Sequence, residues 1–514
     1  MNRKFIEELI RSGAETSGDL ASFKRKASKK YRIACPSNIA LLKTYHELVK
    51  TGSIKKSEKI EKILRTRPIR SLSGIVNVSV LTKPYPCPGK CLYCPTERGI
   101  PKSYVSGEPA VERAKKLHFD PYLQVKKRLE MLEAEGHPTD KVELRIVGGT
   151  WSFYPKKYQE WFVKRCFEAC NDKRFPISSR ISEIHKSNEK ARHRIVGLSI
   201  ETRPDFISPE EIKWLRNLGV TMVELGVQSI YNDVLNKNLR GHSVKETILA
   251  TKLLRDAGFK VLYQMMPNLF GSSPSRDLGM FKILFSSSDF RPDLLKIYPC
   301  ALLKESSLYQ KWQKRKYQPY TEKQLINLIK AIKKIIPYYV RIQRISRDIP
   351  SQSIVSGPAK ISNLRQMVTG QCRCIRCREV KGNYDPKEKL FLFRQDYSAS
   401  GGREVFLSYE NKTRTKLYSL LRLRLIEVKP QSAIIREIHT YGQSLEVRPQ
   451  EGGRTSTDSP QHRGLGKKLI KEAEKIVKKE SASRRISAIS GVGVRDYWRK
   501  LGYKLKDTYM VKKV

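Results

Sequence analysis

The sequence has no long hydrophobic run and few cysteines for its length. Its apolar runs fall far short of the ~20 residues that a membrane-spanning helix needs. No apolar stretch follows the charged start of the chain, so we do not expect a secretory signal peptide. Ten cysteines among 514 residues are too few for a disulfide scaffold. These absences exclude the membrane and disulfide-rich classes and predict a cytoplasmic protein with no membrane partner.

Acidic residues are scarce relative to basic ones. Lys and Arg number 101 and Asp and Glu 51, which gives a formal charge of +50 at pH 7. So basic a chain repels itself unless a polyanion is near, and nucleic acid is the first candidate. Hydrophobic residues still make up 39%, enough for folded cores, so a disordered chain is excluded. At ~150 residues per domain, the length predicts three or four domains.

Residues 1–74 form a basic segment with a mostly helical pattern. They hold 18 Lys or Arg against 7 Asp or Glu. A single run of charge is often a solvated helix face, but this excess favours phosphate binding. The candidate RNA-binding residues are Lys24, Arg25, Lys26, Lys29 and Lys30.

Residues 75–345 alternate short β-rich runs with longer helical stretches. The runs are 75–80, 142–147, 195–200, 221–227, 260–265 and 294–298, and the helical stretches include 111–135, 209–218, 244–257 and 321–336. Nearly continuous apolar strands between helices predict an α/β fold with a parallel, partial (β/α)6 barrel. Functional residues of such barrels lie where the strands end.

Three cysteines, Cys87, Cys91 and Cys94, directly follow the first predicted strand. Three such thiolates can ligate three irons of a 4Fe–4S cluster and leave the fourth iron open to a chelating ligand. A structural zinc ion would need a fourth ligand nearby, which residues 95–97 do not supply. The spacing, the position and the aromatic Tyr93 resemble the radical S-adenosylmethionine (SAM) superfamily.

That resemblance implies roles for polar groups at the later strand ends. In the superfamily, the Gly-Gly segment after the second strand binds the amino group of SAM, which here implies Gly148, Gly149 and Thr150. Glu201 and Gln228 end the third and fourth strands and are candidate catalytic and SAM-binding residues. Each of these groups, taken alone, is also compatible with ordinary turn chemistry.

A second group, Cys372, Cys374 and Cys377, lies in the irregular segment 346–385. A closed tetrahedral zinc site needs a fourth ligand. Cys300, at the end of the sixth predicted strand, is the best candidate. Zinc there would staple this linker to the barrel, and a second iron–sulfur cluster is the competing interpretation.

Residues 386–514 contain strand-like runs, a glycine loop and a helix, and predict an α+β domain. The loop consists of Gln461, His462, Arg463, Gly464, Leu465 and Gly466. Backbone N–H groups at a helix start form an anion pocket. The Q-x-x-G-x-G pattern resembles the pyrophosphate loop of the Gcn5-related acetyltransferases, although a generic glycine turn has the same form. That resemblance implies acetyl-coenzyme A as a co-substrate, with Tyr497 near the thioester and Tyr503 nearby.

A radical SAM barrel joined to an acetyltransferase domain is similar, over nearly the whole chain, to the single-chain catalytic subunits of the Elongator family. The resemblance rests on the segments 87–95, 201–205, 224–229, 266–269 and 372–379. Two departures occur. Tyr497-Trp498 stands where the family often has two tyrosines, and Asp507-Thr508 where it often has Gly-Pro.

The family implies an enzyme that modifies the wobble uridine of tRNA. A deoxyadenosyl radical would remove hydrogen from the acetyl methyl group, the carbon would add to carbon 5 of the base, and water would cleave the thioester. The anticodon stem-loop would be the RNA partner, a homodimer is possible, and any need for other Elongator subunits stays open. The alternatives are a protein lysine acetyltransferase with the barrel as a nucleic-acid-binding scaffold, and an RNA-binding subunit with degenerate domains.

Overall fold

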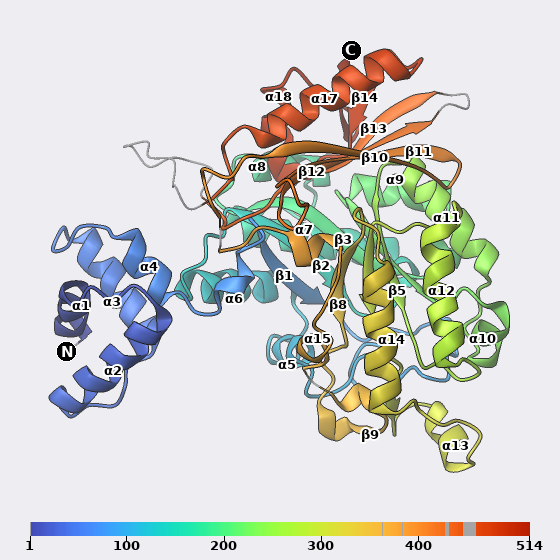
Figure 1. Cartoon of the computed structure of the whole chain (residues 1–514), viewed down its shortest axis with the longest axis horizontal. Coiled ribbons are helices and arrows are strands. Elements are labelled where there is room, and N and C mark those ends of the chain that lie inside the picture. The colour runs from blue at the N-terminus through green and yellow to red at the C-terminus, as the bar shows by residue number, and fades with distance from the viewer. Residues whose placement is uncertain (1, 362, 383, 427–430, 446–458) are drawn as a thin grey trace.

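The computed structural model describes residues 2–361, 363–382, 384–426, 431–445 and 459–514. A small helical region stands to one side of two larger parts, each built on its own seven-stranded sheet (Figure 1). No helix among these residues is both long and apolar enough to cross a membrane.

The N-terminal region is helical, as its pattern predicts. Its helices are α1 (Asn2–Arg11), α2 (Ser17–Tyr31), α3 (Asn38–Lys50) and α4 (Glu58–Leu64). Helix α2 begins at a capping box, in which Thr16 and Asp19 satisfy each other's backbone N–H groups. The four helices bury a separate small core. Arg65 joins this region to the barrel, because its Nε donates to the Gly136 carbonyl oxygen at 2.7 Å.

The first sheet is a parallel half-barrel, which confirms the predicted fold class. Its strands are β1 (Val76–Leu81), β2 (Lys141–Val147), β3 (Arg194–Thr202), β4 (Met222–Gln228), β5 (Lys260–Met265), β6 (Leu294–Ile297) and β8 (Arg341–Ile345), paired in that order. The first six match the predicted runs closely. The seventh strand, β8, was not predicted, although Val340, Ile342 and Ile345 are buried along an otherwise polar run.

Helices connect the strands of this sheet, and most of them cover its outer face (Figure 1). They are α5 (Pro109–Lys116), α6 (Pro121–Ala134), α7 (Lys156–Asn171), α8 (Ile181–Asn188), α9 (Pro209–Asn217), α10 (Asn232–Lys237), α11 (Val244–Asp256), α12 (Pro274–Ser286), α13 (Leu308–Gln313) and α14 (Glu322–Ile335). The stretch 111–135 is two helices rather than one. Asp120 caps α6 by accepting from the Leu123 N–H at 2.9 Å, and Pro121 cannot continue a helix from α5.

The linker holds little regular structure. A short strand pair, β7 (Leu302–Leu303) with β9 (Ile354–Ser356), is followed by the one-turn helices α15 (Leu364–Met367) and α16 (Ile375–Arg378). Helix α16 lies against the start of β8, where the Ile375 N–H donates to the Val340 carbonyl oxygen at 2.9 Å.

The second sheet forms the C-terminal part. Its strands are β10 (Phe391–Ala399), β11 (Gly402–Glu410), β12 (Leu417–Ile426), β13 (Ser432–Thr440), β14 (Arg485–Ala488), β15 (Lys504–Lys506) and β16 (Tyr509–Lys513). The order is β10-β11-β12-β13-β14-β16-β15, and the β13–β14 pair alone is parallel among the pairs described. Helix α17 (Leu465–Glu480) packs on it, with α18 (Arg495–Arg499) beyond.

The two sheets meet at the amino ends of the barrel strands. Arg436 of β13 donates to Asp293 at 2.6 Å and to Glu404 at 2.8 Å, with all three side chains buried. At the same face, a Cβ on Gly491 would lie 2.1 Å from the Val196 carbonyl oxygen of β3, so a larger residue would separate the two parts. Removing one partner of a buried ion pair leaves an uncompensated charge, so this interface holds the two parts in one arrangement.

Candidate active site

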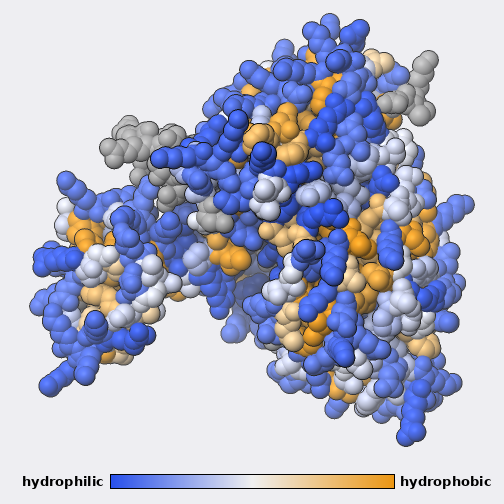
Figure 2. Space-filling model, viewed as in Figure 1, coloured by the Kyte–Doolittle hydropathy of each residue, from blue (hydrophilic) through white to orange (hydrophobic). Residues whose placement is uncertain are grey.

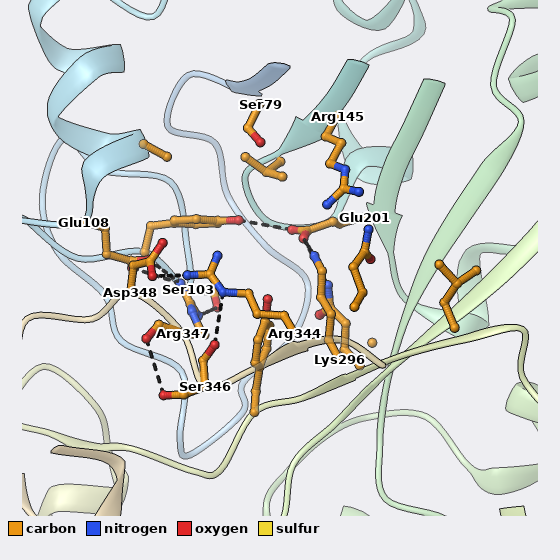
Figure 3. Close-up of a pocket in the computed structure, with 18 of the residues that line it drawn as sticks. Ser79, Ser103, Glu108, Arg145, Glu201, Lys296, Arg344, Ser346, Arg347 and Asp348 are labelled. Atoms are coloured by element: carbon orange, nitrogen blue, oxygen red, sulfur yellow. Dashed lines mark hydrogen bonds and ion pairs between the residues drawn. The ribbon is translucent and has the colours of Figure 1, made fainter. Parts of the chain in front are cut away.

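A cavity of about 600 Å³ occupies the inside of the half-barrel (Figure 3). Near the carboxyl ends of the strands its lining includes Cys87, Cys91 and Cys94. At the amino ends it includes Glu437 and His439 of the second sheet. The lining therefore runs from the first cysteine group to the C-terminal part of the protein.

Glu201 lies inside this cavity, in contact with a lysine. Lys296 of β6 donates to Glu201 at 3.0 Å, and the Tyr104 hydroxyl donates to it at 3.1 Å. Lys296 also pairs with Glu224 of β4. Burial raises the pKa of Glu224. Burial also acts to raise the pKa of Glu201, but Lys296, Arg347 and the Tyr104 hydroxyl together lower it below the usual value. The Lys296 ammonium therefore helps to keep Glu201 ionised beside Glu224, which is the weaker acid.

Buried donors surround the first cysteine group. Arg240 Nη1 donates to the Cys91 sulfur at 3.5 Å. Arg240 Nε, Arg203 Nη1 and the Tyr93 hydroxyl are buried and have no hydrogen-bond partner among the described residues. A Cβ on Gly89 would lie 2.6 Å from Arg203 Nη1, so a larger residue there would displace this guanidinium group. Donors without protein acceptors, close to three thiols, fit the sulfides of a 4Fe–4S cluster.

The spacing of these thiols also fits a cluster better than a single ion. Among the described residues, the sulfurs of Cys87, Cys91 and Cys94 do not all lie within 4.8 Å of one another. Two cysteines on one zinc ion at ~2.3 Å are at most ~4.6 Å apart. Cysteines on three different irons of a cube are held farther apart.

The predicted SAM-binding residues gather near this group. Gly149, Thr150, Glu201 and Gln228 line the same cavity. The Thr150 hydroxyl lies 3.7 Å from the Cys87 sulfur. Gln228 has a φ of +69°, and its buried Oε1 accepts no hydrogen bond from the described residues. Such a strained backbone with an unpaired polar atom is typical of a ligand-binding position.

Gly148 does not line the cavity itself but precedes the two residues that do. It has a φ of +128°, and a Cβ there would lie 2.1 Å from Thr82 Oγ1. The Thr82 hydroxyl donates to the Gly148 carbonyl oxygen at 2.9 Å. Gly148 therefore sets the turn that brings Gly149 and Thr150 into the cavity.

The second cysteine group is compact. The sulfurs of Cys372, Cys374 and Cys377 all lie within 4.8 Å of one another, which suits one metal ion. No fourth His, Cys, Asp or Glu side chain of the described residues joins them.

Cys300 does not lie with this group, so the structure does not support it as the fourth ligand. It is buried in a different apolar cluster, beside Leu302 and Tyr317. Burial raises the pKa of its thiol to about 12. The sequence placed Cys300 correctly at the end of β6, but the linker returns to the opposite, amino end of the barrel at β8.

Comparisons with known proteins agree with this geometry. Residues 85–276 match the Radical SAM superfamily, and residues 292–373 match the Radical SAM C-terminal domain. The tRNA uridine(34) acetyltransferase of Methanocaldococcus infernus is 43% identical over 96% of this chain and 95% of its own length. The chain belongs to the family of tRNA uridine(34) acetyltransferases.

Relatives of the family extend to animals. Elongator complex protein 3 of Homo sapiens is 37% identical over 87% of this chain and 86% of its own. The solved structure of M. infernus Elp3 with an N-terminal deletion has a TM-score of 0.75 and 42% identity, and the match covers 86% of this chain and 100% of that one. Membership of the radical SAM superfamily implies a 4Fe–4S cluster and SAM, which the first cysteine group and its donors fit.

In this chain, the glycine loop lies at the start of α17. Gly464 is the N-cap with a φ of +82°, and a Cβ there would meet nothing within 4 Å. A Cβ on Gly466 would lie 2.9 Å from the Tyr497 hydroxyl, so these two predicted residues come together. Leu465 is buried and anchors the helix start, whereas His462 and Arg463 are exposed.

Two other predicted residues of this part are engaged elsewhere. Gln461 bridges the two sheets, since its Oε1 accepts from Lys141 at 2.7 Å and its Nε2 donates to the Gly74 carbonyl oxygen at 3.2 Å. Tyr503 is buried in the core of the C-terminal part and donates to Glu474 at 2.9 Å. Among the described residues, Gln461 therefore joins the two sheets and Tyr503 stabilises the core of the C-terminal part.

The five predicted RNA-binding residues share helix α2: Lys24, Arg25, Lys26, Lys29 and Lys30. Lys24 donates to Asn38 at 2.9 Å and Lys30 pairs with Glu8 at 2.6 Å. The others are exposed, and Figure 2 shows mainly hydrophilic residues over this region.

The sequence analysis missed several charged residues of the site. Lys296 and the arginines Arg203 and Arg240 have no place among the predicted residues, although each contacts one of them or its neighbours. A signal existed for Lys296, because a charged residue in the apolar run 294–297 is unusual unless it has a buried partner.

Proposed function

We propose that this protein attaches a carboxymethyl group to carbon 5 of the wobble uridine of tRNA, with acetyl-coenzyme A as the carbon source. The observation that supports this most is the single cavity. Its lining joins Cys91 at one end to His439 of the second sheet at the other. The space beside the first cysteine group therefore extends as far as β13 of the C-terminal part, the part that holds Gly464 and Tyr497.

The bound cluster and SAM would supply a deoxyadenosyl radical able to remove hydrogen from the acetyl methyl group. Cys87, Cys91 and Cys94 hold the cluster, and Arg240 donates to one of its thiolates. Glu201, kept ionised by Lys296, is an acceptor for the ammonium or hydroxyl groups of SAM. Addition of this carbon to carbon 5 would leave a base radical, which would return one electron to the oxidised cluster and release the carbon-5 proton. Hydrolysis of the thioester would then leave the carboxymethyl group on the base and release coenzyme A.

The start of α17 is the proposed binding site for the pyrophosphate of acetyl-coenzyme A. Its free backbone N–H groups and positive dipole favour an anion, and Gly464 leaves open space there. Burial raises the pKa of Tyr497 to about 12, so its hydroxyl keeps its proton at neutral pH. Tyr497 can therefore donate a hydrogen bond to the thioester.

The compact group of Cys372, Cys374 and Cys377 supports a structural zinc ion rather than a second cluster. The exposed positive charges of α2 would hold tRNA phosphates, and the target base must leave its stack to enter the cavity.

The test is mass spectrometry of tRNA nucleosides. The full chain is purified without oxygen, its cluster is reconstituted, and it is given tRNA, SAM, acetyl-coenzyme A and a reductant. We expect carboxymethyluridine that depends on both SAM and acetyl-coenzyme A. Deoxyadenosine without a new nucleoside would move the substrate elsewhere. Neither product, together with acetylated protein lysine, would favour a protein acetyltransferase.

A further inference from the structure

Three aromatic rings line the outer rim of the barrel mouth. Tyr85 follows β1, Phe153 follows β2 and Phe206 follows β3. The ring centroids of Tyr85 and Phe153 are 6.0 Å apart, and those of Phe153 and Phe206 are also 6.0 Å apart. The carboxyl ends of three successive strands thus supply one continuous set of rings, which we call the aromatic strip.

The aromatic strip is partly open to solvent. Phe153 is 37% exposed, and Tyr85 and Phe206 are half-buried. The rings continue along α7 through Tyr158 to Trp161, which is 44% exposed. Exposed apolar patches of this kind mark interaction sites, because burying the same rings would stabilise the fold.

Positive charge borders the aromatic strip. The Lys83 ammonium lies 4.9 Å from the centre of the Tyr158 ring, and Lys157 is exposed at the start of α7, where its neighbour Lys156 pairs with Glu211. The nearby carboxylate of Asp205 is already paired with Arg203 at 2.7 Å. Aromatic rings edged by lysines suit nucleic acid, whose bases stack and whose phosphates are negative.

The aromatic strip also begins at the reaction centre. Tyr85 is two residues before Cys87, and Phe153 is three residues after Thr150, whose hydroxyl lies 3.7 Å from the Cys87 sulfur. When one base leaves its stack for such a cavity, the faces of its neighbours lose their stacking partners. Rings just outside the mouth can replace those partners.

We propose that the aromatic strip is a stacking platform for the unpaired nucleotides that flank the target base. The inference rests on the proposed function for the nature of the RNA, and it adds the means by which a flipped-out loop is held. Stacking carries no charge and reads no base edge, so the strip selects single-stranded loops rather than a particular sequence.

The test uses the full chain and an anticodon stem-loop RNA with 2-aminopurine beside the wobble uridine. Stacking on the protein quenches this base. We expect quenching with the natural chain and its loss in Phe153→Leu. The affinity should become about 5- to 150-fold weaker, the equivalent of ~1–3 kcal/mol per stacked base. Affinity for a fully paired RNA hairpin should stay the same.

The matched control is Phe391→Leu. Phe391 begins β10, and its ring is also partly exposed and lies near a lysine, Lys389, but it is outside the aromatic strip. The salt dependence of RNA affinity should not change in Phe153→Leu, because no phosphate contact is removed. Should Phe153→Leu unfold the protein, Phe206→Leu carries the same test.

Unchanged quenching and affinity in the folded variant would overturn the platform, whether or not carboxymethyluridine forms. Quenching that depends on Phe153, without any modified nucleoside from the natural chain, would support the platform and reject the proposed reaction. The two proposals can therefore fail separately.

Discussion

The two ends of the half-barrel differ in how their charges are satisfied. At the amino end, arginines meet carboxylates, as where Arg436 donates to Asp293 and Glu404. At the carboxyl end, Arg240 forms no ion pair with a described residue and donates to the thiol of Cys91. At the amino end these arginines have carboxylate partners within the protein, although Arg255 Nε and Arg422 Nη1 have no hydrogen-bond partner among the described residues. The carboxyl end has donors left for groups that the protein does not contain.

The two cysteine groups follow the same division. Cys372, Cys374 and Cys377 lie together at the amino end, close enough for one ion. Cys87, Cys91 and Cys94 at the carboxyl end are spread around unpaired donors. We therefore expect the first group to serve chemistry and the second to serve stability, although their sequence motifs are similar.

Removing a thiol at the carboxyl end should have the largest effect on activity. In Cys91→Ala we expect no cluster absorbance and no carboxymethyluridine, because the third iron loses its ligand. RNA affinity should be kept. Cys35→Ala, an exposed cysteine outside both groups, is the control. Loss of RNA binding as well would mean that the first group is structural.

Removing a thiol at the amino end should instead reduce stability. For Cys374→Ser we expect the free energy of unfolding to fall by about 4 kcal/mol or more, since loss of a structural metal is among the few changes of that size. Bound zinc measured by mass spectrometry should fall by one ion per chain while iron stays. Equal loss of iron would remove the distinction between the two ends.

Acid should weaken the amino end through Glu437. Burial opposes ionisation there, but Lys260 and Arg422 lower its pKa from 4.5 to about 2. The folded state binds this proton more weakly than the unfolded state. The stability it gives is complete above about pH 4.5 and is lost as the pH falls toward 2.

We therefore expect Glu437→Gln to lose on the order of 3 kcal/mol of pH-dependent stability over that range. Denaturant unfolding at pH 5 and pH 3 should show about 2 kcal/mol of it, because the folded-state pKa of about 2 lies below this range. Glu47→Gln on the exposed face of α3 is the control. An unchanged pH dependence would mean that Glu437 is not ionised at the interface.

The smallest expected effect concerns the cluster potential. Arg240→Met removes a donor to Cys91, and such a donor stabilises the electron-rich, reduced cluster. We expect the midpoint potential to fall by up to about 60–130 mV, the equivalent of ~1.5–3 kcal/mol for a charged hydrogen bond. Redox titration followed by electron paramagnetic resonance measures it, with the exposed Arg98→Met as the control. No shift would show that the contact does not reach the cluster.

Much of the half-barrel could be predicted because its signals are local. Six apolar runs marked β1 to β6, and the spacing of Cys87, Cys91 and Cys94 marked the cluster loop. Strand β8 was not predicted, because its sequence Arg-Ile-Gln-Arg-Ile holds three polar residues and only two apolar ones. The stretch 111–135 was predicted as one helix, although the helix cap Asp120 and the following Pro121 indicate that a new helix begins there.

The C-terminal part was less predictable in its residues than in its fold. Gly466 and Tyr497 come close to each other, as the resemblance implies. Gln461 instead bridges the two sheets, and Tyr503 lies in the core of the C-terminal part. Nothing local distinguishes a glutamine that binds a ligand from one that bridges two sheets.

The sequence by itself determined the elements that depend on neighbours along the chain: the period of the strands, the helix caps and the two cysteine motifs. Tertiary structure alone decided which distant groups meet. It placed Lys296 between Glu201 and Glu224, aimed Arg240 at Cys91, and kept Cys300 away from Cys372. The physical reason is that parallel strands bring residues from separate β/α units to a common end, and which side chains face each other there is set by packing across the sheet.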